Sequence, residues 1–167
     1  RCPKVNVYLK SFSRPVDVLR EGFDIAVRVR FGPIESSDLV MKPLGMSCQC
    51  LVASPALART IPSPGDPHAL SQLPTLALGS EQRESHWRLD GPDGARLVVP
   101  FTPRLVTDDM LALKQAALNG VGVVALPLLM IRDELDAGTL VDVGAPWQPE
   151  AGSVHAIFPS RRGLLPG

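Results

Sequence analysis

A short apolar run, residues 121–126, lies between two segments with helical patterns. It has no polar alternation, which is typical of a strand buried on both faces. Residues 111–118 before it are mostly strong helix formers, and Asn119-Gly120 supplies a C-terminal stop signal. Thr107 is the expected N-cap, because a threonine side chain accepts a hydrogen bond from the first free backbone N–H groups. The pattern therefore predicts a helix that begins at Thr107 and a buried strand after it.

A second helix is predicted from Pro127 to Gly138, because proline suits the first helical turn and glycine commonly follows the last. Its apolar side chains share one face: Leu128, Ile131 and Leu135. Helix, buried strand and helix predict an α/β sheet covered by helices. The first helix presents free N–H groups at its N-terminus, so we expect a ligand site there. Asp108 and Asp109 argue against a bare phosphate and leave a carboxylate or a polar ligand.

The N-terminal region predicts a strand, a short helix and a second strand, at residues 5–9, 16–21 and 23–29. A strand–helix–strand unit this short favours a parallel, right-handed arrangement. Ligands of such units lie at the carboxyl ends of the strands, and Ser11, Ser13 and Arg28 lie near those ends.

The rest of the chain predicts short strands and a proline-rich segment. Residues 55–74 predict short helices packed on a core, because leucines recur among the prolines. The remaining predicted strands cover residues 39–44, 47–53, 75–78, 87–89, 96–100, 140–143 and 154–158. Residues 140–143 are expected at a sheet edge.

Composition narrows the class of protein. The chain has 167 residues, which suits one domain or two small lobes, and 45% of them are apolar. With 17 basic and 17 acidic residues it lacks the basic surface that binds nucleic acid. No apolar run is long enough to cross a bilayer, and the N-terminus does not resemble a signal peptide. We therefore expect no membrane contact.

Three cysteines, an odd number, favour a reducing compartment over a disulfide framework. Cys48 and Cys50 lie two apart in a predicted strand and so share a face. A redox or metal role needs further ligands, and the three histidines show no ligand spacing. The favoured interpretation is that these cysteines are small buried hydrophobes, and no metal site is expected.

A glycine motif in residues 120–125 matches the dinucleotide-binding fingerprint G-x-G-x-x-A. That fingerprint requires a strand before it and a helix after it, and here the order is reversed. NAD binding is therefore rejected, and no cofactor is expected. The chain contains no G-x-S-x-G, H-E-x-x-H or P-loop motif, so it offers no catalytic set and we expect no enzyme.

Taken in order, several segments resemble one known family. They include GFDIAVRV, LVASP, the A-x-x-x-G-x-G-V-x-x-L-P pattern of residues 116–127, and a final strand that ends in FPSRR. The chain resembles the effector-binding domain of LysR-type transcriptional regulators over almost its whole length. The combination is specific, although each piece alone is weak.

The resemblance implies an α/β fold similar to type 2 periplasmic binding proteins, with two lobes and a ligand cleft between them. The first lobe would comprise residues 1–46 and 157–167, and the second lobe residues 47–156. The chain would cross between the lobes near residues 45–48 and 157–159. The family's winged helix-turn-helix, the first strand and helix of the effector domain and its last helix are expected to lie outside this chain, so the first lobe would be incomplete.

The resemblance also implies a small-molecule effector bound in the cleft. The residues that match the family's cleft positions are Ser11, Ser13, Arg28, Val106, Thr107 and Asp108. Arg28 and the helix end favour an organic anion. Two structural alternatives stay open: Arg28 pairs with Asp24 on its own strand, and Thr107 only caps its helix.

For the parent protein, the resemblance implies a cytoplasmic homo-oligomer, a dimer or a tetramer, that binds DNA only through the absent N-terminal domain. The alternative is a periplasmic solute-binding protein of similar fold that serves a transporter. A small α/β enzyme is a third class, for which the sequence offers no nucleophile or base.

Overall fold

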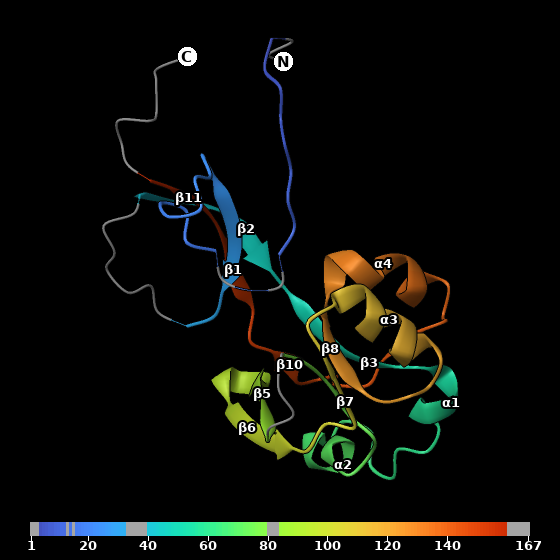
Figure 1. Ribbon diagram of the computed structural model, residues 1–167. Helices are drawn as coiled ribbons and strands as arrows, with labels where there is room; N and C mark the ends of the chain where they lie inside the picture. The colour runs from blue at the N-terminus through green and yellow to red at the C-terminus, as the bar shows by residue number, and fades with distance from the viewer. Residues whose placement is uncertain (1–3, 13, 15, 33–39, 80–83, 160–167) are drawn as a thin grey trace.

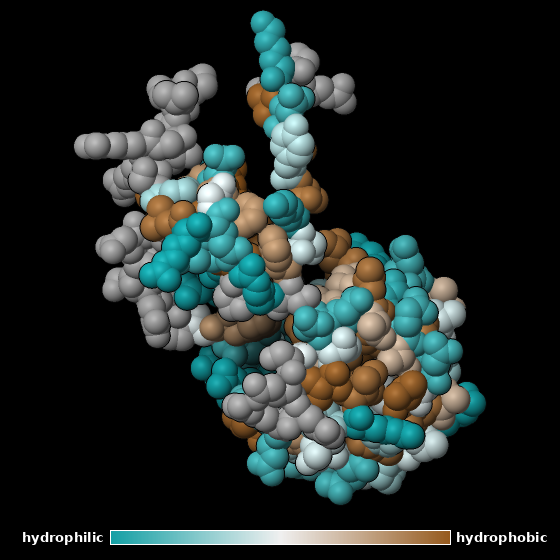
Figure 2. Space-filling model, in the orientation of Figure 1, coloured by the Kyte–Doolittle hydropathy of each residue, from teal (hydrophilic) through white to brown (hydrophobic). Residues whose placement is uncertain are grey.

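The computed structural model describes residues 4–12, 14, 16–32, 40–79 and 84–159. Two parts of the chain are joined by two neighbouring connections (Figure 1). Figure 2 shows the same two parts as space-filling masses. We call residues 4–47 and 152–159 the first lobe, and residues 49–150 the second lobe. Ser47 pairs with Gly152, so the two connections leave the first lobe side by side.

The first lobe contains one antiparallel sheet of three strands. In spatial order they are β1 (Ala26–Arg30), β11 (Gly152–Phe158) and β2 (Val40–Ser47). The last strand of the chain therefore lies in the centre of the sheet, between two strands from the N-terminal third. All of β11 pairs within this sheet, so the return connection precedes Gly152, earlier than the residues 157–159 expected from the sequence.

In the described residues, the second lobe contains three small sheets and four short α-helices. Figure 1 shows how these elements are arranged. Its first sheet has the order β8 (Val124–Pro127), β3 (Gln49–Ala53) and β9 (Val141–Asp142). The second has the order β10 (Gln148–Pro149), β5 (Ser85–Asp90) and β6 (Arg96–Phe101). The third pairs β4 (Leu76–Leu78) with β7 (Leu105–Thr107) in parallel. The helices are α1 (Pro55–Ala58), α2 (Pro67–Ser71), α3 (Met110–Leu118) and α4 (Leu128–Asp136), with a 3₁₀ turn at Pro92–Gly94.

Strand β3 divides the core of the second lobe, because neighbouring side chains of a strand point to opposite faces. Leu51 belongs to an apolar cluster with the β5 and β6 side chains Trp87 and Val99. Val52 belongs to a second cluster with Leu113 of α3 and Ile131 of α4. Both Leu51 and Val52 are 0% exposed. The strand therefore holds the β5–β6 hairpin and the helix pair together through its two faces.

Gly122 permits the close approach of the chain before β8 to the chain before β4. A Cβ atom at this position would lie 2.7 Å from the backbone oxygen of Pro74, closer than van der Waals contact allows. The backbone there is tightly paired, since the Val123 N–H donates to the Pro74 carbonyl at 2.8 Å. Gly122, the second glycine of the G-x-G-x-x-A motif, is therefore needed for the close packing of these two chain segments.

Helices α3 and α4 are joined by an ion pair between partly buried side chains. Lys114 Nζ lies 2.5 Å from Glu134 Oε1 and donates to the Met130 carbonyl at 2.9 Å. The hydrogen bond from Lys114 to the Glu134 carboxylate is the main cause that holds the pKa of Glu134 below its usual value. The pair fixes the two helices that cover one face of β3.

Several sequence predictions are confirmed. Gly120 and Gly138 follow the two predicted helices with φ angles of 75° and 68°, in the left-handed region that favours glycine. The strand between these helices forms as β8 and is buried at Val124 and Leu126. However, it begins at Val124 and not at residue 121, and Pro127 ends this strand and does not start the second helix. Short helices occupy residues 55–58 and 67–71 of the proline-rich segment, and β9 lies at a sheet edge.

The prediction for the N-terminal unit is wrong. Residues 5–9 form no strand, and the described chain offers no strand that pairs with them; Tyr8 is 90% exposed. The helix predicted at residues 16–21 is only a hydrogen-bonded turn, since one or two bonds do not offset the cost of starting a helix. Strand β1 pairs antiparallel with β11, so the parallel arrangement does not form.

The start of α3 also differs from the prediction. Thr107 ends strand β7, which the sequence pattern did not indicate, and the N-cap is Asp109. The Asp109 carboxylate accepts hydrogen bonds from the backbone N–H groups of Leu111 and Ala112, at 2.8 and 3.3 Å. Tertiary pairing of β7 with β4 keeps Thr107 extended, so the helix begins later.

Candidate functional site

The first lobe reaches the second through Phe31, which follows β1. Gly152 makes this possible, because a Cβ atom there would lie 3.0 Å from Phe31 Cε1 and would also collide with Val29. Phe31 therefore packs beside the return connection. It also lines two cavities of the second lobe, so these cavities lie where the lobes meet.

The largest of the described cavities has a volume of about 430 Å³, within the usual range for small-molecule sites. It lies at the N-terminus of α3 and is lined by Phe31 of the first lobe, by Gln49 of β3, and by β4, β5 and β8. Its apolar lining consists of Phe31, Leu76, Ala77, Leu78, Trp87, Phe101, Met110, Leu113, Val124, Ala125, Leu126 and Pro127.

A second cavity of about 220 Å³ continues the first. The two share the residues Phe31, Gln49, His86, Trp87 and Ala125. The second cavity adds groups from β5 and from the segment that precedes β11, among them Arg88 and Glu150. Together the two cavities form one recess, with Gln49 in the wall that they share.

Two buried aromatic rings that stack on each other line this recess. The ring centroids of Trp87 and Phe101 lie 4.4 Å apart, with their planes tilted by 32°. They come from opposite strands of the β5–β6 hairpin, and both side chains are buried. Since aromatic pairs of this kind keep a fixed geometry, this part of the lining is already formed without a ligand.

Polar groups in the largest cavity are few: Gln49, Glu84, Ser85 and His86. Among the described residues, the side-chain amide of Gln49 makes no hydrogen bond, although the residue is half-buried. No lysine or arginine of the described chain lines this cavity. The site is thus apolar, with a neutral amide that can both donate and accept a hydrogen bond.

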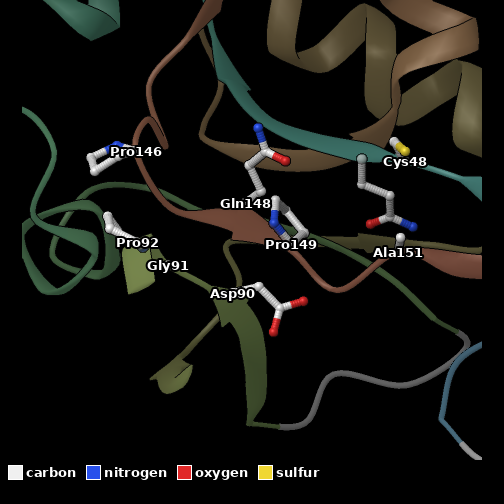
Figure 3. Close-up of a pocket in the computed structure, with 9 residues that line it drawn as sticks. Cys48, Asp90, Gly91, Pro92, Pro146, Gln148, Pro149 and Ala151 are labelled. Carbon is white, nitrogen blue, oxygen red and sulfur yellow. The ribbon is translucent and has the colours of Figure 1, made fainter. Parts of the chain in front are cut away.

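A third cavity, of about 280 Å³, lies beside both connections between the lobes. Figure 3 shows the side chains that line it, among them Cys48, Asp90 and Gln148. Cys48 is exposed and lies between β2 and β3, so the prediction of a buried side chain on a strand face is wrong for it. Cys50 packs against the apolar cluster under α3 and α4. Burial, then the charge of Asp142, raises the pKa of the Cys50 thiol, which suits the predicted role of a small buried hydrophobe.

The structure places Ser11 and Arg28, two residues predicted for the site, outside the lining of this recess. Ser11 is exposed and lines none of the described cavities, and Ser13 lies outside the described residues. The guanidinium of Arg28 donates a hydrogen bond to the Val16 carbonyl. Within the described chain no ion pair joins Arg28 to Asp24. A ligand role for Ser11, Ser13 and Arg28 stays a prediction.

The residues predicted at the helix end lie next to the recess. Val106 and Thr107 are half-buried in β7, and Asp108 is exposed. The Thr107 hydroxyl accepts from the Asp109 N–H at 3.2 Å, so Thr107 has a local structural role. Met110, the first residue of α3, lines the largest cavity, whereas Val106, Thr107 and Asp108 do not. Their ligand role also stays a prediction.

The sequence interpretation missed the stacked pair of aromatic side chains. The signal was present in residues 85–90, where Trp87 and Leu89 alternate with polar side chains and so predict a half-buried strand. Only the pairing of β5 with β6 brings Trp87 beside Phe101. The two residues are too far apart in sequence for spacing to join them.

The family model named LysR substrate binding domain matches the sequence over residues 1–167. The chain belongs to this family. An HTH-type transcriptional regulator of Escherichia coli K12, YhjC, described as uncharacterized, is 28% identical over 171 residues, which cover 97% of this chain and 54% of that protein. The HTH-type transcriptional regulator PtxR of Pseudomonas aeruginosa is 28% identical over 160 residues, which cover 96% of this chain and 50% of that protein.

Solved structures show the same fold. The full-length Vibrio cholerae virulence activator AphB, a member of the LTTR protein family, matches 98% of this chain and 54% of its own, with a TM-score of 0.78 and 24% identity. The effector domain of AmpR from Pseudomonas aeruginosa matches 95% of this chain and 74% of its own, with a TM-score of 0.71 and 24% identity. The predicted two-lobe α/β fold of this LysR domain is confirmed.

The LysR-family chain spans about half the length of the curated relatives it matches. These relatives are transcriptional regulators, so the alternative of a transporter's solute-binding protein is not supported. In the part of the chain that the structure describes, no three metal-binding side chains gather at one place. No helix of the described residues is both long and apolar enough to span a membrane.

Proposed function

We propose that this chain is the ligand-sensing part of a bacterial LysR-type transcriptional regulator. A small molecule binds in the recess between the lobes and favours one angle between them. A ligand can shift that equilibrium only through its different affinity for the two states. The supporting observation is a cavity of about 430 Å³ that takes Phe31 from the first lobe and its other lining from the second.

The two connections support this mechanism, because both run past the recess. Gln49 begins β3 directly after the first connection and lines both cavities, and Glu150 lines the smaller cavity just before the second connection. A ligand that contacts these residues touches the segments that join the lobes. A change in the lobe angle would then move Phe31 relative to the rest of the cavity lining, which belongs to the second lobe.

In the parent protein, the change in the lobe angle would pass through a homo-oligomer to a DNA-binding domain outside this chain. The chain itself has no net charge, so it would contact DNA only through that domain. Such a regulator would act in the cytoplasm, where its DNA lies. No catalytic step is part of this proposal.

Blocking the recess tests the proposal in the full-length regulator. Leu78 lines the largest cavity and is 50% exposed, so Leu78→Trp would fill the cavity without disturbing the core. Leu129 on α4 is 90% exposed and lines none of the described cavities, so Leu129→Trp is the matched control. We expect Leu78→Trp, and not Leu129→Trp, to abolish the effect of the inducing molecule on transcription in vitro. An unchanged response in the Leu78 variant would overturn the proposal.

Arg28→Ala tests the site that the sequence predicted. If Arg28 binds the ligand, the variant loses ligand affinity while its thermal unfolding stays close to that of the parent. If the hydrogen bond to the Val16 carbonyl is the only role of Arg28, stability falls and ligand affinity is retained. Calorimetric titration together with thermal unfolding separates these outcomes.

A further inference from the structure

We propose that the recess between the lobes selects an uncharged aromatic compound that carries one hydrogen-bonding group, and that Gln49 recognises that group. This inference names the ligand class of the site and rests on the proposed function. It differs from the organic anion that the sequence favoured. The reasons are the charge, the shape and the polar groups of the cavity lining.

The charge of the lining disfavours an anion. Among the described residues, the two cavities of the recess are lined by the carboxylates of Glu84 and Glu150 and by one cation, Arg88, so acids outnumber the cation. Arg28, the cation on which the anion prediction rested, donates to the Val16 carbonyl and does not line the cavity. In the larger cavity, which Arg88 does not line, a carboxylate ligand would lose its water without gaining a cationic partner, and burial of an unpaired charge is costly.

The N-terminus of α3 does not replace the missing cation. Helix N-termini bind anions through backbone N–H groups that have no partner within the helix. Here the Asp109 carboxylate accepts from the N–H groups of Leu111 and Ala112. An anion at this end would have to displace a carboxylate of the chain itself, and Asp108 lies next to it.

The shape of the lining favours a planar ring. Trp87 and Phe101 stack on each other on one strand pair, and Leu76 and Val124 come from the neighbouring sheets. These four side chains are buried, so they are held in place before the ligand arrives. A rigid apolar cavity binds a rigid apolar ligand with the highest affinity, because neither the protein nor the ligand loses much conformational freedom on binding.

Gln49 supplies the polar contact. Its amide is half-buried, lines both cavities of the recess, and makes no hydrogen bond to the described residues. A side-chain amide offers donors and an acceptor without net charge. It therefore complements a neutral amide, hydroxyl or carbonyl group on the ring. A ligand that forms a hydrogen bond with this amide binds more tightly than an analogue that leaves the amide unpaired.

Benzamide and benzoate are matched probes, because they share a ring and a similar shape and differ in charge. We would titrate each into the purified 167-residue chain, and follow heat together with the NMR signal of the Trp87 indole N–H. Benzamide is expected to shift this signal and to bind at least about tenfold more tightly than benzoate. Leu78→Trp should abolish benzamide binding, and Leu129→Trp should leave it unchanged.

Gln49→Leu tests the polar contact, with toluene as the control ligand. Toluene has the ring but no hydrogen-bonding group, so the variant should bind toluene as well as the parent chain does. Its affinity for benzamide should fall roughly tenfold. Retained toluene binding shows that the variant is folded, and equal losses for both probes would rule out a hydrogen-bonding role for Gln49.

The other outcomes overturn different claims. If benzoate binds as tightly as benzamide and Leu78→Trp blocks both, the ligand class is wrong and the proposed site stands. If neither probe shifts the Trp87 signal at millimolar concentration, the ligand class is also wrong. If benzamide binds and Leu78→Trp does not affect it, the recess is not the binding site, and the proposed function loses its supporting observation.

Discussion

The two lobes bury their apolar strand faces to very different extents. In the second lobe, Leu51 and Val52 lie on opposite faces of β3 and both are 0% exposed. In the first lobe, Val27 and Val29 share one face of β1, yet they are 64% and 46% exposed. Strand β3 has apolar side chains on both faces, whereas β1 alternates valines with arginines. Apolar side chains become core only where a second layer covers them.

The elements that cover a sheet also determine which lobe contributes the rigid side chains of the site. Helices α3 and α4 and the β5–β6 hairpin cover the two faces of β3, so side chains between them are fixed. Trp87 and Phe101 belong to that packed region. The first lobe contributes Phe31, which is 48% exposed, from the end of a strand with one open face. We therefore expect the second lobe to determine ligand shape and the first lobe to move.

The largest expected effect contrasts a core side chain with one on the open face. Leu113 is 0% exposed in the cluster under α3, so Leu113→Ala should reduce the free energy of unfolding by about 2–5 kcal/mol. Val27→Ala should change it by less than about 0.5 kcal/mol, because the side chain already contacts solvent. Urea unfolding of both variants measures the difference. Equal losses would show that a layer covers β1 in solution.

A smaller effect is expected at the connection between the lobes. Gly152→Ala would force Phe31 and Val29 to move, and overpacking of this kind typically costs about 1–3 kcal/mol. Gly45→Ala on β2 is the matched control, since a Cβ atom there meets nothing within 4 Å. Thermal unfolding compares the variants. A Gly152 variant as stable as the Gly45 variant would contradict the packing of Phe31 on the connection.

The cap of α3 should contribute about 1 kcal/mol. Asp109→Ala removes the carboxylate that accepts from two N–H groups of the first turn, and loss of such a cap costs roughly that amount. Asp108→Ala leaves the cap in place, and a smaller loss is expected. Chemical unfolding curves of the two variants show which aspartate is the cap. The opposite order would contradict the cap that Asp109 forms.

The smallest expected effect is the acid dependence of an exposed ion pair in the first lobe. Two hydrogen bonds from Arg14, at 2.8 and 2.7 Å, lower the pKa of Glu21 from 4.5 to about 2. Because the folded pKa is depressed, the pair stabilises the fold above pH 4.5, and this contribution is lost as the pH falls towards 2.

NMR titration of the Glu21 carboxyl measures this pKa directly. Arg14→Met should return it towards the ordinary glutamate value. In the second lobe, Lys114→Met should likewise raise the pKa of Glu134, which the Lys114 hydrogen bond holds low. If the Glu21 titration does not respond to the Arg14 variant, the ion pair does not form in solution.

Local signals predicted much of the second lobe. The order helix, buried strand and helix in residues 110–136, the stops at Gly120 and Gly138, and the short helices of the proline-rich segment all follow from nearby residues. The wrong predictions concern segments whose structure depends on pairing with residues far away in the sequence. Thr107 became the end of β7 because β4 pairs with it, and residues 5–9 stayed exposed because the described chain offers them no strand.

The sequence by itself determined the family, the α/β class and the two-lobe plan, because these depend on motifs and on the order of local elements. Tertiary structure alone decided which side chains meet. It placed β11 between β1 and β2, brought Trp87 beside Phe101, and turned Arg28 towards the Val16 carbonyl. The physical reason is that helix stops and strand periods act between near neighbours, whereas a binding recess forms from side chains joined only by strand pairing and packing.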